Sequence, residues 1–105
     1  MLPKLVRDKI PEIIRDSGKS CRAHYADSPE FDDRIVEKMA EELLEFSVNP
    51  TLEEAADMYE VFLAILKNWK LSLQDVKEAA RIKRNSRGSF ERGVVLDEVS
   101  EIIGV

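Results

Sequence analysis

The chain has 105 residues, enough for one domain with its own core, and we expect residues 1–105 to form a single domain. Apolar residues make up 44% of it and charged residues 35%. This composition is typical of globular proteins, although the share of charged residues is high. The 16 basic and 21 acidic residues give a net charge of −5, which argues against a nucleic-acid partner or an anionic membrane.

Cysteine and histidine occur once each, as Cys21 and His24. A single cysteine forms no intramolecular disulfide and no CxxC zinc site, and a single histidine excludes sites that need two. We find no signal peptide and no run of 18 apolar residues, so we expect a cytoplasmic protein without a membrane partner.

The first third of the chain predicts one short helix and a connection. Pro11 suits the first turn of a helix over about 10–16, which Gly18 would close. Cys21–Tyr25 lacks a helical period and is expected to be an extended connection or a short edge strand. Ser28 is the expected cap of the next helix, with a proline in its first position.

Two amphipathic helices are expected to dominate the middle of the chain. Apolar residues between Ile35 and Phe46 recur at i, i+3 and i+4, and Asn49-Pro50 ends that pattern. Thr51–Glu54 then reads as a capping box that starts the second helix. A turn between the two helices would make them an antiparallel hairpin.

The last third predicts a helix capped by Ser72 and ended by the basic stretch Arg81–Arg92. Val94–Leu96 is expected to be extended, and Asp97–Ile103 to form a last helical turn or two. Two long helices and one medium helix bury little apolar surface in a single chain, and a bundle shared between chains buries more. The expected elements are predominantly helical, so we expect an all-α fold. Its helical hairpin would form an oligomeric helical bundle, with short extended segments near the termini.

Four acidic residues mirror one another about Asn49-Pro50, namely Glu42 and Glu45 before it and Glu54 and Asp57 after it. Each pair has i,i+3 spacing, so each occupies one helix face, and the hairpin would bring the pairs to matching heights. Carboxylates held that close repel unless a cation lies among them. The quartet therefore predicts a divalent metal site, for Mg²⁺ or alternatively Mn²⁺.

The alternative is that these residues are an ordinary solvated face, since acidic residues at helical spacing are usually that. Glu54 also has a structural role open to it, as part of the capping box. The apolar pairs Leu43-Leu44 and Ala55-Ala56 inside the two motifs favour an inward-facing site. Glu41 and Glu53 are expected beside the site or on the surface.

With these residues in place, the chain resembles the MazG-like all-α nucleoside triphosphate pyrophosphohydrolases. It resembles more closely their short branch labelled phosphoribosyl-ATP pyrophosphohydrolase-like. The quartet matches the family pattern ExxE followed by ExxD. The segment Lys4–Pro11 (KLVRDKIP) matches the N-terminal motif of the short branch. Arg87–Glu91 (RGSFE) matches the C-terminal motif of that branch. Eight residues separate Glu45 from Glu54, fewer than in MazG proper.

The resemblance implies Mg²⁺-dependent cleavage of a nucleoside triphosphate into a monophosphate and pyrophosphate. It also implies the four acidic residues as metal ligands and a homodimer or homotetramer of helical bundles. Glu42 and Glu45 are the expected catalytic residues, because a glutamate not fully engaged with metal can accept a proton from water.

A triphosphate needs cations besides the metal. The expected substrate-binding residues are Lys4, Arg7, Lys9, Lys83 and Arg87. The alternative for each is a solvated charge that balances the acidic helices. Two other functions stay open: a non-catalytic helical oligomerisation or partner-binding module, and an enzyme relic that binds nucleotide without turnover.

Overall fold

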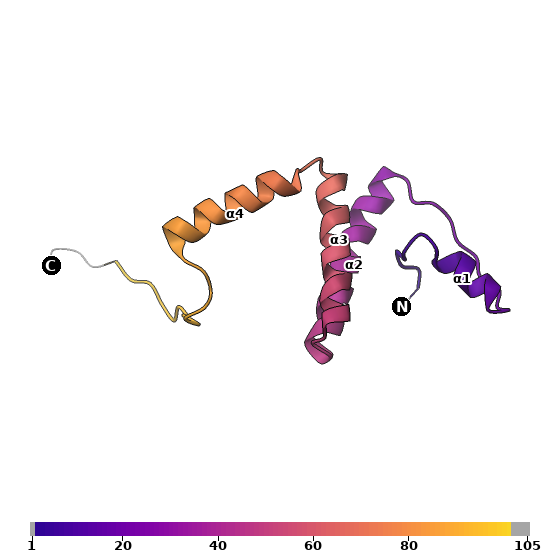
Figure 1. Ribbon diagram of the computed structural model, residues 1–105, viewed down its shortest axis with the longest axis horizontal. Helices are drawn as coiled ribbons and strands as arrows, with labels where there is room; N and C mark the ends of the chain where they lie inside the picture. The colour runs from indigo at the N-terminus through magenta and orange to yellow at the C-terminus, as the bar shows by residue number, and fades with distance from the viewer. Residues whose placement is uncertain (1, 102–105) are drawn as a thin grey trace. The chain divides into compact units, whose positions relative to one another are not determined.

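The computed structural model describes residues 2–101, which contain four α-helices and no strand, so the expectation of an all-α fold is confirmed. The helices are α1 (Ile10–Asp16), α2 (Ser28–Val48), α3 (Leu52–Asn68) and α4 (Leu73–Arg87) (Figure 1). The chain divides into two units at residues 1–73 and 74–105. Each unit is described by itself, and a single domain over the whole chain stays a prediction.

The centre of the first unit is the hairpin of α2 and α3, which lie side by side and are joined by a tight turn (Figure 1). Ile35, Val61 and Leu66 are the buried apolar side chains within residues 2–101. At the open end of the hairpin, Asn68 Nδ2 donates a hydrogen bond to Asp32 Oδ1 at 2.7 Å. This bond and the tight turn fix which residues of α2 and α3 face one another.

The two hairpin helices begin at capping residues. Asp27, not Ser28, caps α2, because its backbone is extended and its Oδ1 accepts a hydrogen bond from the backbone N–H of Glu30 at 3.0 Å. Ser28 is already helical. At α3 the predicted cap is confirmed, since Thr51 Oγ1 accepts from the backbone N–H of Glu54 at 3.2 Å.

The short helix α1 has the predicted bounds. It ends where Gly18 adopts a positive φ of 89° and the backbone N–H of Lys19 reaches back to the carbonyl of Ile14 at 3.3 Å. A left-handed residue is needed there, and glycine adopts it without a steric penalty. The following residues 19–27 form neither helix nor strand, so Cys21–Tyr25 is a connection rather than an edge strand.

In the second unit, regular structure ends with α4. Residues 94–96 form no helix or strand, and the helical turns predicted over Asp97–Ile103 are wrong for residues 97–101. Residues 102 and 103 lie outside the described residues. No described residue of this unit is buried, and a turn or two of helix is unstable without packing.

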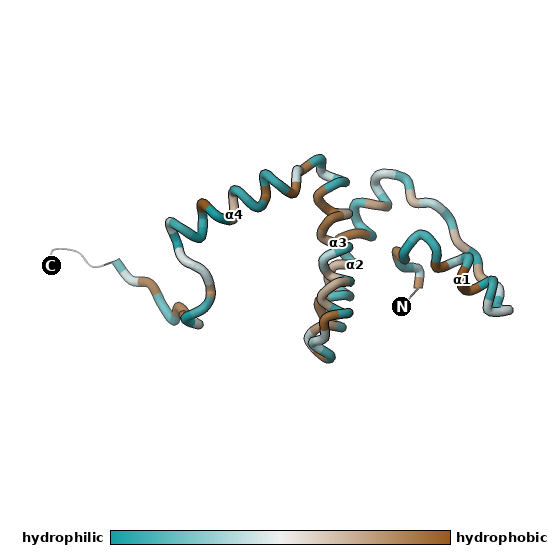
Figure 2. The backbone as a smooth tube through the Cα atoms, viewed as in Figure 1, coloured by the Kyte–Doolittle hydropathy of each residue, from teal (hydrophilic) through white to brown (hydrophobic). Residues whose placement is uncertain are grey.

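Apolar and polar residues alternate along all four helices (Figure 2). Within residues 2–101, none of the helices combines the length and the apolar character that a membrane span requires.

Candidate metal centre

The hairpin brings three of the four predicted ligands together. Glu42 from α2 and Glu54 and Asp57 from α3 each offer a carboxylate oxygen, and these oxygens lie within 4.8 Å of one another. Glu42 is only 5% exposed, whereas Glu54 and Asp57 are half-buried. A solvated acidic face is therefore wrong as a description of Glu42, because its carboxylate has been withdrawn from water.

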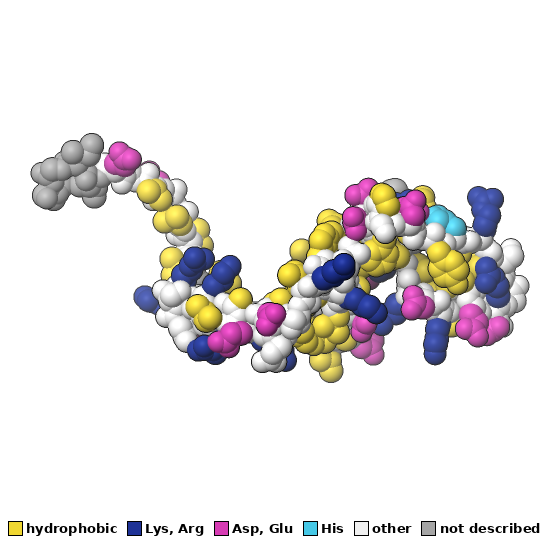
Figure 3. Space-filling model, turned by 90° about the horizontal axis from the view of Figure 1, so that it is seen from above, with side chains coloured by type: hydrophobic (Ala, Val, Ile, Leu, Met, Phe, Trp, Pro, Cys, Tyr) yellow, Lys and Arg dark blue, Asp and Glu magenta, His cyan; other side chains and the backbone are white. Residues whose placement is uncertain are grey.

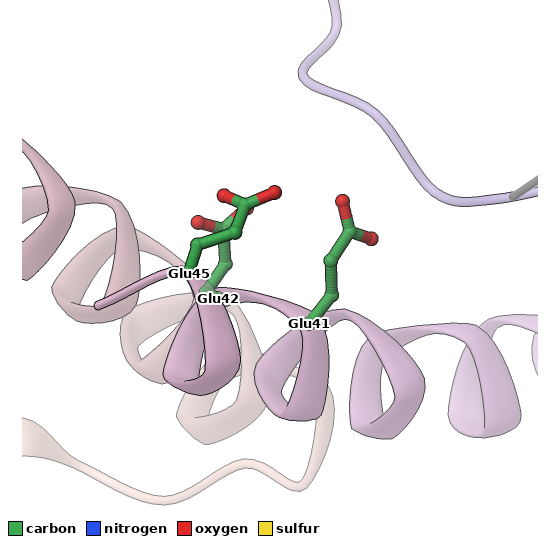
Figure 4. Close-up of side chains that lie close together, drawn as sticks. All are labelled: Glu41, Glu42 and Glu45. Carbon is green, nitrogen blue, oxygen red and sulfur yellow. The ribbon is translucent and has the colours of Figure 1, made fainter. Parts of the chain in front are cut away.

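The fourth predicted ligand, Glu45, belongs to a second group on α2. Its carboxylate oxygen lies within 4.8 Å of oxygens from Glu41 and Glu42, and Figure 4 shows the three side chains extending from the same side of the helix. The neighbouring Glu42 carboxylate is the main cause that raises the pKa of Glu45 above its ordinary value of 4.5. Glu42 thus belongs to both groups.

Two carboxylate oxygens of the site are buried without a hydrogen-bond partner among residues 2–101, Oε2 of Glu42 and Oε2 of Glu54. Leaving such an oxygen unsatisfied costs free energy, and a hard cation that prefers oxygen ligands would satisfy both. The donor set therefore fits Mg²⁺ or Mn²⁺. The capping bond to Thr51 uses the backbone N–H of Glu54, so Oε2 of its side chain is not engaged in the cap.

The segment before α1 supplies positive charge to the same place. Arg7 Nη2 lies 2.7 Å from Asp57 Oδ1, and Lys4 Nζ lies 3.2 Å from Glu41 Oε1. Although partial burial favours the neutral form of Glu41, hydrogen bonds and charges from Lys4 and Lys38 lower its pKa. The site therefore pairs several of its carboxylates with cations that could also bind phosphate.

A cavity of about 840 Å³ lies between this segment and the hairpin. Its charged lining residues are Lys4, Arg7, Asp8, Lys9, Lys38, Glu42, Asp57 and Glu60. Three of the five predicted substrate-binding residues thus line one cavity with two of the predicted metal ligands. The other two, Lys83 and Arg87, lie on α4 in the second unit, and their part in the site stays a prediction.

Sequence reasoning missed Lys38. Its Nζ lies 3.2 Å from Glu42 Oε1 and 3.4 Å from Glu41 Oε1. Burial opposes the charge of Lys38, but its hydrogen bond with Glu42 and the nearby carboxylates prevail and raise its pKa. The i,i+4 spacing of Lys38 and Glu42 was the available signal, because residues four apart are neighbours on a helix.

Comparisons of the chain with protein-family models, with curated proteins and with solved structures found no match. A function can therefore be proposed only from the chemistry of this site.

Proposed function

We propose that this protein is a cytoplasmic, Mg²⁺-dependent nucleotide pyrophosphohydrolase of the MazG-like kind, which cleaves nucleoside triphosphates to monophosphate and pyrophosphate. Its task would be house-cleaning, the removal of non-standard or excess nucleotides from the nucleotide pool. The observation that supports the proposal most is the buried, unpartnered oxygen of Glu42 beside oxygens of Glu54 and Asp57. Paired carboxylates alone are common. A desolvated carboxylate with a free oxygen, at the wall of a cavity lined by Arg7 and Lys9, favours a cation and a phosphate ligand.

In this proposal Glu42, Glu54 and Asp57 would hold the ion, and Glu45 would join them or stay free for proton transfer. When bound, Mg²⁺ neutralises charge on the phosphate chain and polarises a phosphoryl oxygen. Lys4, Arg7 and Lys9 line the cavity in which the phosphates would lie, where they would orient the chain and offset its charge.

The reaction joins a water oxygen to the α-phosphorus and breaks the bond between that phosphorus and the oxygen that bridges to the β-phosphate. Pyrophosphate is the leaving group. A carboxylate takes the proton of the water. Of the two predicted catalytic residues, Glu45 is exposed and open to a water, whereas one oxygen of Glu42 is held by Lys38. This difference favours Glu45 as the proton acceptor and Glu42 as a ligand.

The proposal is tested with a panel of NTPs and dNTPs in MgCl₂, scored for pyrophosphate release. We expect at least one nucleotide to be hydrolysed. We expect Glu42→Gln to lower the rate by about 100-fold or more, because losing a metal ligand should cost at least as much as losing a group that only orients one. Glu53→Gln is the matched control, because Glu53 is exposed on the same hairpin and belongs to neither acidic group. No pyrophosphate from any nucleotide, or equal rates in the two variants, would refute the proposal.

We also propose that the chain assembles with itself, as a homodimer or homotetramer. Several large apolar side chains of the hairpin stay exposed, among them Val36 (57%), Leu43 (54%) and Leu44 (66%) on α2, and Tyr59 (50%) on α3. Figure 3 shows such side chains on the surface of the hairpin. A second hairpin packed on this face would bury them in a shared helical bundle.

A further inference from the structure

Lys38 is the most enclosed cation that contacts the metal centre. Its side chain is 15% exposed, against 56% for Arg7 and 37% for Lys4. It lies on the inner face of α2, one turn before Glu42, and it lines the same cavity. An ammonium group so far out of water needs negative partners, and it has them in Glu41 and Glu42.

The two oxygens of Glu42 differ in a way that bears on Lys38. Oε1 lies 3.2 Å from the ammonium, whereas Oε2 is buried and has no partner within residues 2–101. A divalent ion that binds this carboxylate would stand close to the ammonium, and the two positive charges would repel. Binding of the ion thus favours movement of the ammonium away from Glu42.

The Lys38 ammonium could also lie farther into the cavity, away from Glu42. The lysine stem is flexible and its ammonium can turn without movement of the backbone. The cavity wall beside it already contains Lys4, Arg7 and Lys9, a set of positive charges suited to a chain of phosphates.

We propose that Lys38 is an exchangeable cation of this site. Its ammonium neutralises Glu42 when no divalent ion is bound, and it binds a phosphate of the substrate once the ion has taken Glu42. This inference rests on the proposed function and adds a substrate-binding residue to it. The exchange would make binding of the metal and binding of the phosphate chain cooperative, because the ion releases the Lys38 ammonium and the ammonium then binds a phosphate.

Isothermal titration calorimetry of wild type, Lys38→Met and Lys38→Arg tests the exchange. Each protein is titrated with MgCl₂ alone, and then with α,β-methylene ATP, a non-hydrolysable triphosphate, in saturating MgCl₂. We expect Lys38→Met to bind Mg²⁺ more tightly than wild type, by up to about tenfold, because a competing charge is gone. It should bind the nucleotide about 10- to 100-fold more weakly, the range of one hydrogen bond between charged groups.

Lys38→Arg keeps the charge and should bind the nucleotide within about threefold of wild type. Lys67→Met is the matched control, because Lys67 is an exposed helix lysine outside this cavity, and it should change neither affinity. Circular dichroism checks folding. If Lys38→Met does not fold, Lys38→Gln replaces it, because it is also uncharged and its amide is able to donate a hydrogen bond.

Unchanged or weaker Mg²⁺ binding by Lys38→Met would overturn the exchange, since Lys38 would then not compete with the ion for Glu42. Unchanged nucleotide binding by that variant would overturn it as well. A wild type that binds neither MgCl₂ nor the nucleotide would instead refute the proposed function, and the exchange with it. The two failures are therefore distinguishable.

Discussion

The fold keeps the carboxyl group of Glu42 away from water. The side chain is 7% exposed, one oxygen lies 3.2 Å from Lys38, and the other has no partner within the described residues. An unsatisfied buried group of this kind costs about 1–3 kcal/mol, a sizeable part of the stability of a small domain. A cation bound at Oε2, as proposed above, would remove this cost.

The repulsion between the carboxylates of Glu45 and Glu42 can be tested by changing the pH. Its pKa is raised above the ordinary value of 4.5, chiefly by Glu42, so the folded state holds the proton of Glu45 more tightly than the unfolded chain does. Ionisation of Glu45 therefore destabilises the fold as the pH rises above 4.5 through the raised pKa. We expect Glu45→Gln to melt at a higher temperature than wild type at neutral pH in EDTA.

The difference in melting temperature should vanish once the pH falls below about 4.5, where Glu45 is protonated in both states. Differential scanning fluorimetry in EDTA across this pH range measures it, with Glu53→Gln as the control. A Glu45→Gln variant that melts below wild type at neutral pH would contradict the repulsion.

At the scale of the elements, the first turn of α3 has two separate tasks. Thr51 Oγ1 satisfies the backbone N–H of Glu54 and so begins the helix, whereas the side chain of Glu54 extends to Glu42 and Asp57. The capping bond needs only the backbone of Glu54. The two tasks can therefore be removed one at a time.

We expect Thr51→Ala to lower the free energy of unfolding by about 1 kcal/mol, the usual value of such a cap, with or without Mg²⁺. Glu54→Gln should leave that stability unchanged or higher in EDTA and should lose most of the stabilisation that Mg²⁺ gives wild type by mass action. Urea unfolding in EDTA and in MgCl₂ measures both. If Glu54→Gln is destabilised in EDTA as Thr51→Ala is, and keeps the Mg²⁺ effect, Glu54 is a capping residue only.

At the scale of the whole molecule, the first unit has little core of its own. Its buried apolar side chains within the described residues are Ile35, Val61 and Leu66, while the outer stripe of α2 remains exposed. Val36, Ala40 and Leu43 follow one another on that stripe at i, i+4 and i+7, apart from the inner face. A second copy would cover it.

We expect Leu43→Glu to reduce the mass in solution from dimer or tetramer to monomer, because a charge in an apolar interface is costly to bury. Light scattering coupled to size-exclusion chromatography measures the mass. Val95→Glu is the control, since Val95 is an exposed apolar residue (78%) of the second unit. A monomeric wild type, or equal effects of the two variants, would contradict assembly through the hairpin.

The bounds of α1 and the start of α3 were predictable from the sequence, because the signals for them are local. Pro11 and Gly18 predicted the bounds of α1, and Thr51 predicted the start of α3. Local signals failed where two neighbouring residues could both cap a helix, as Asp27 and Ser28 could cap α2. Only the backbone angles decide which of the two is the N-cap. They also failed at residues 97–101, where no packing supports the predicted turns.

The tertiary structure alone decided which charges meet. The mirrored spacing predicted that Glu42 would face Asp57, but not that Glu42 would be buried with a free oxygen while Glu45 stayed exposed. Nor does any local pattern join Arg7 to Asp57, which are 50 residues apart. Burial and long-range pairing depend on how the segments pack in space, and the chemistry of carboxylates depends on both.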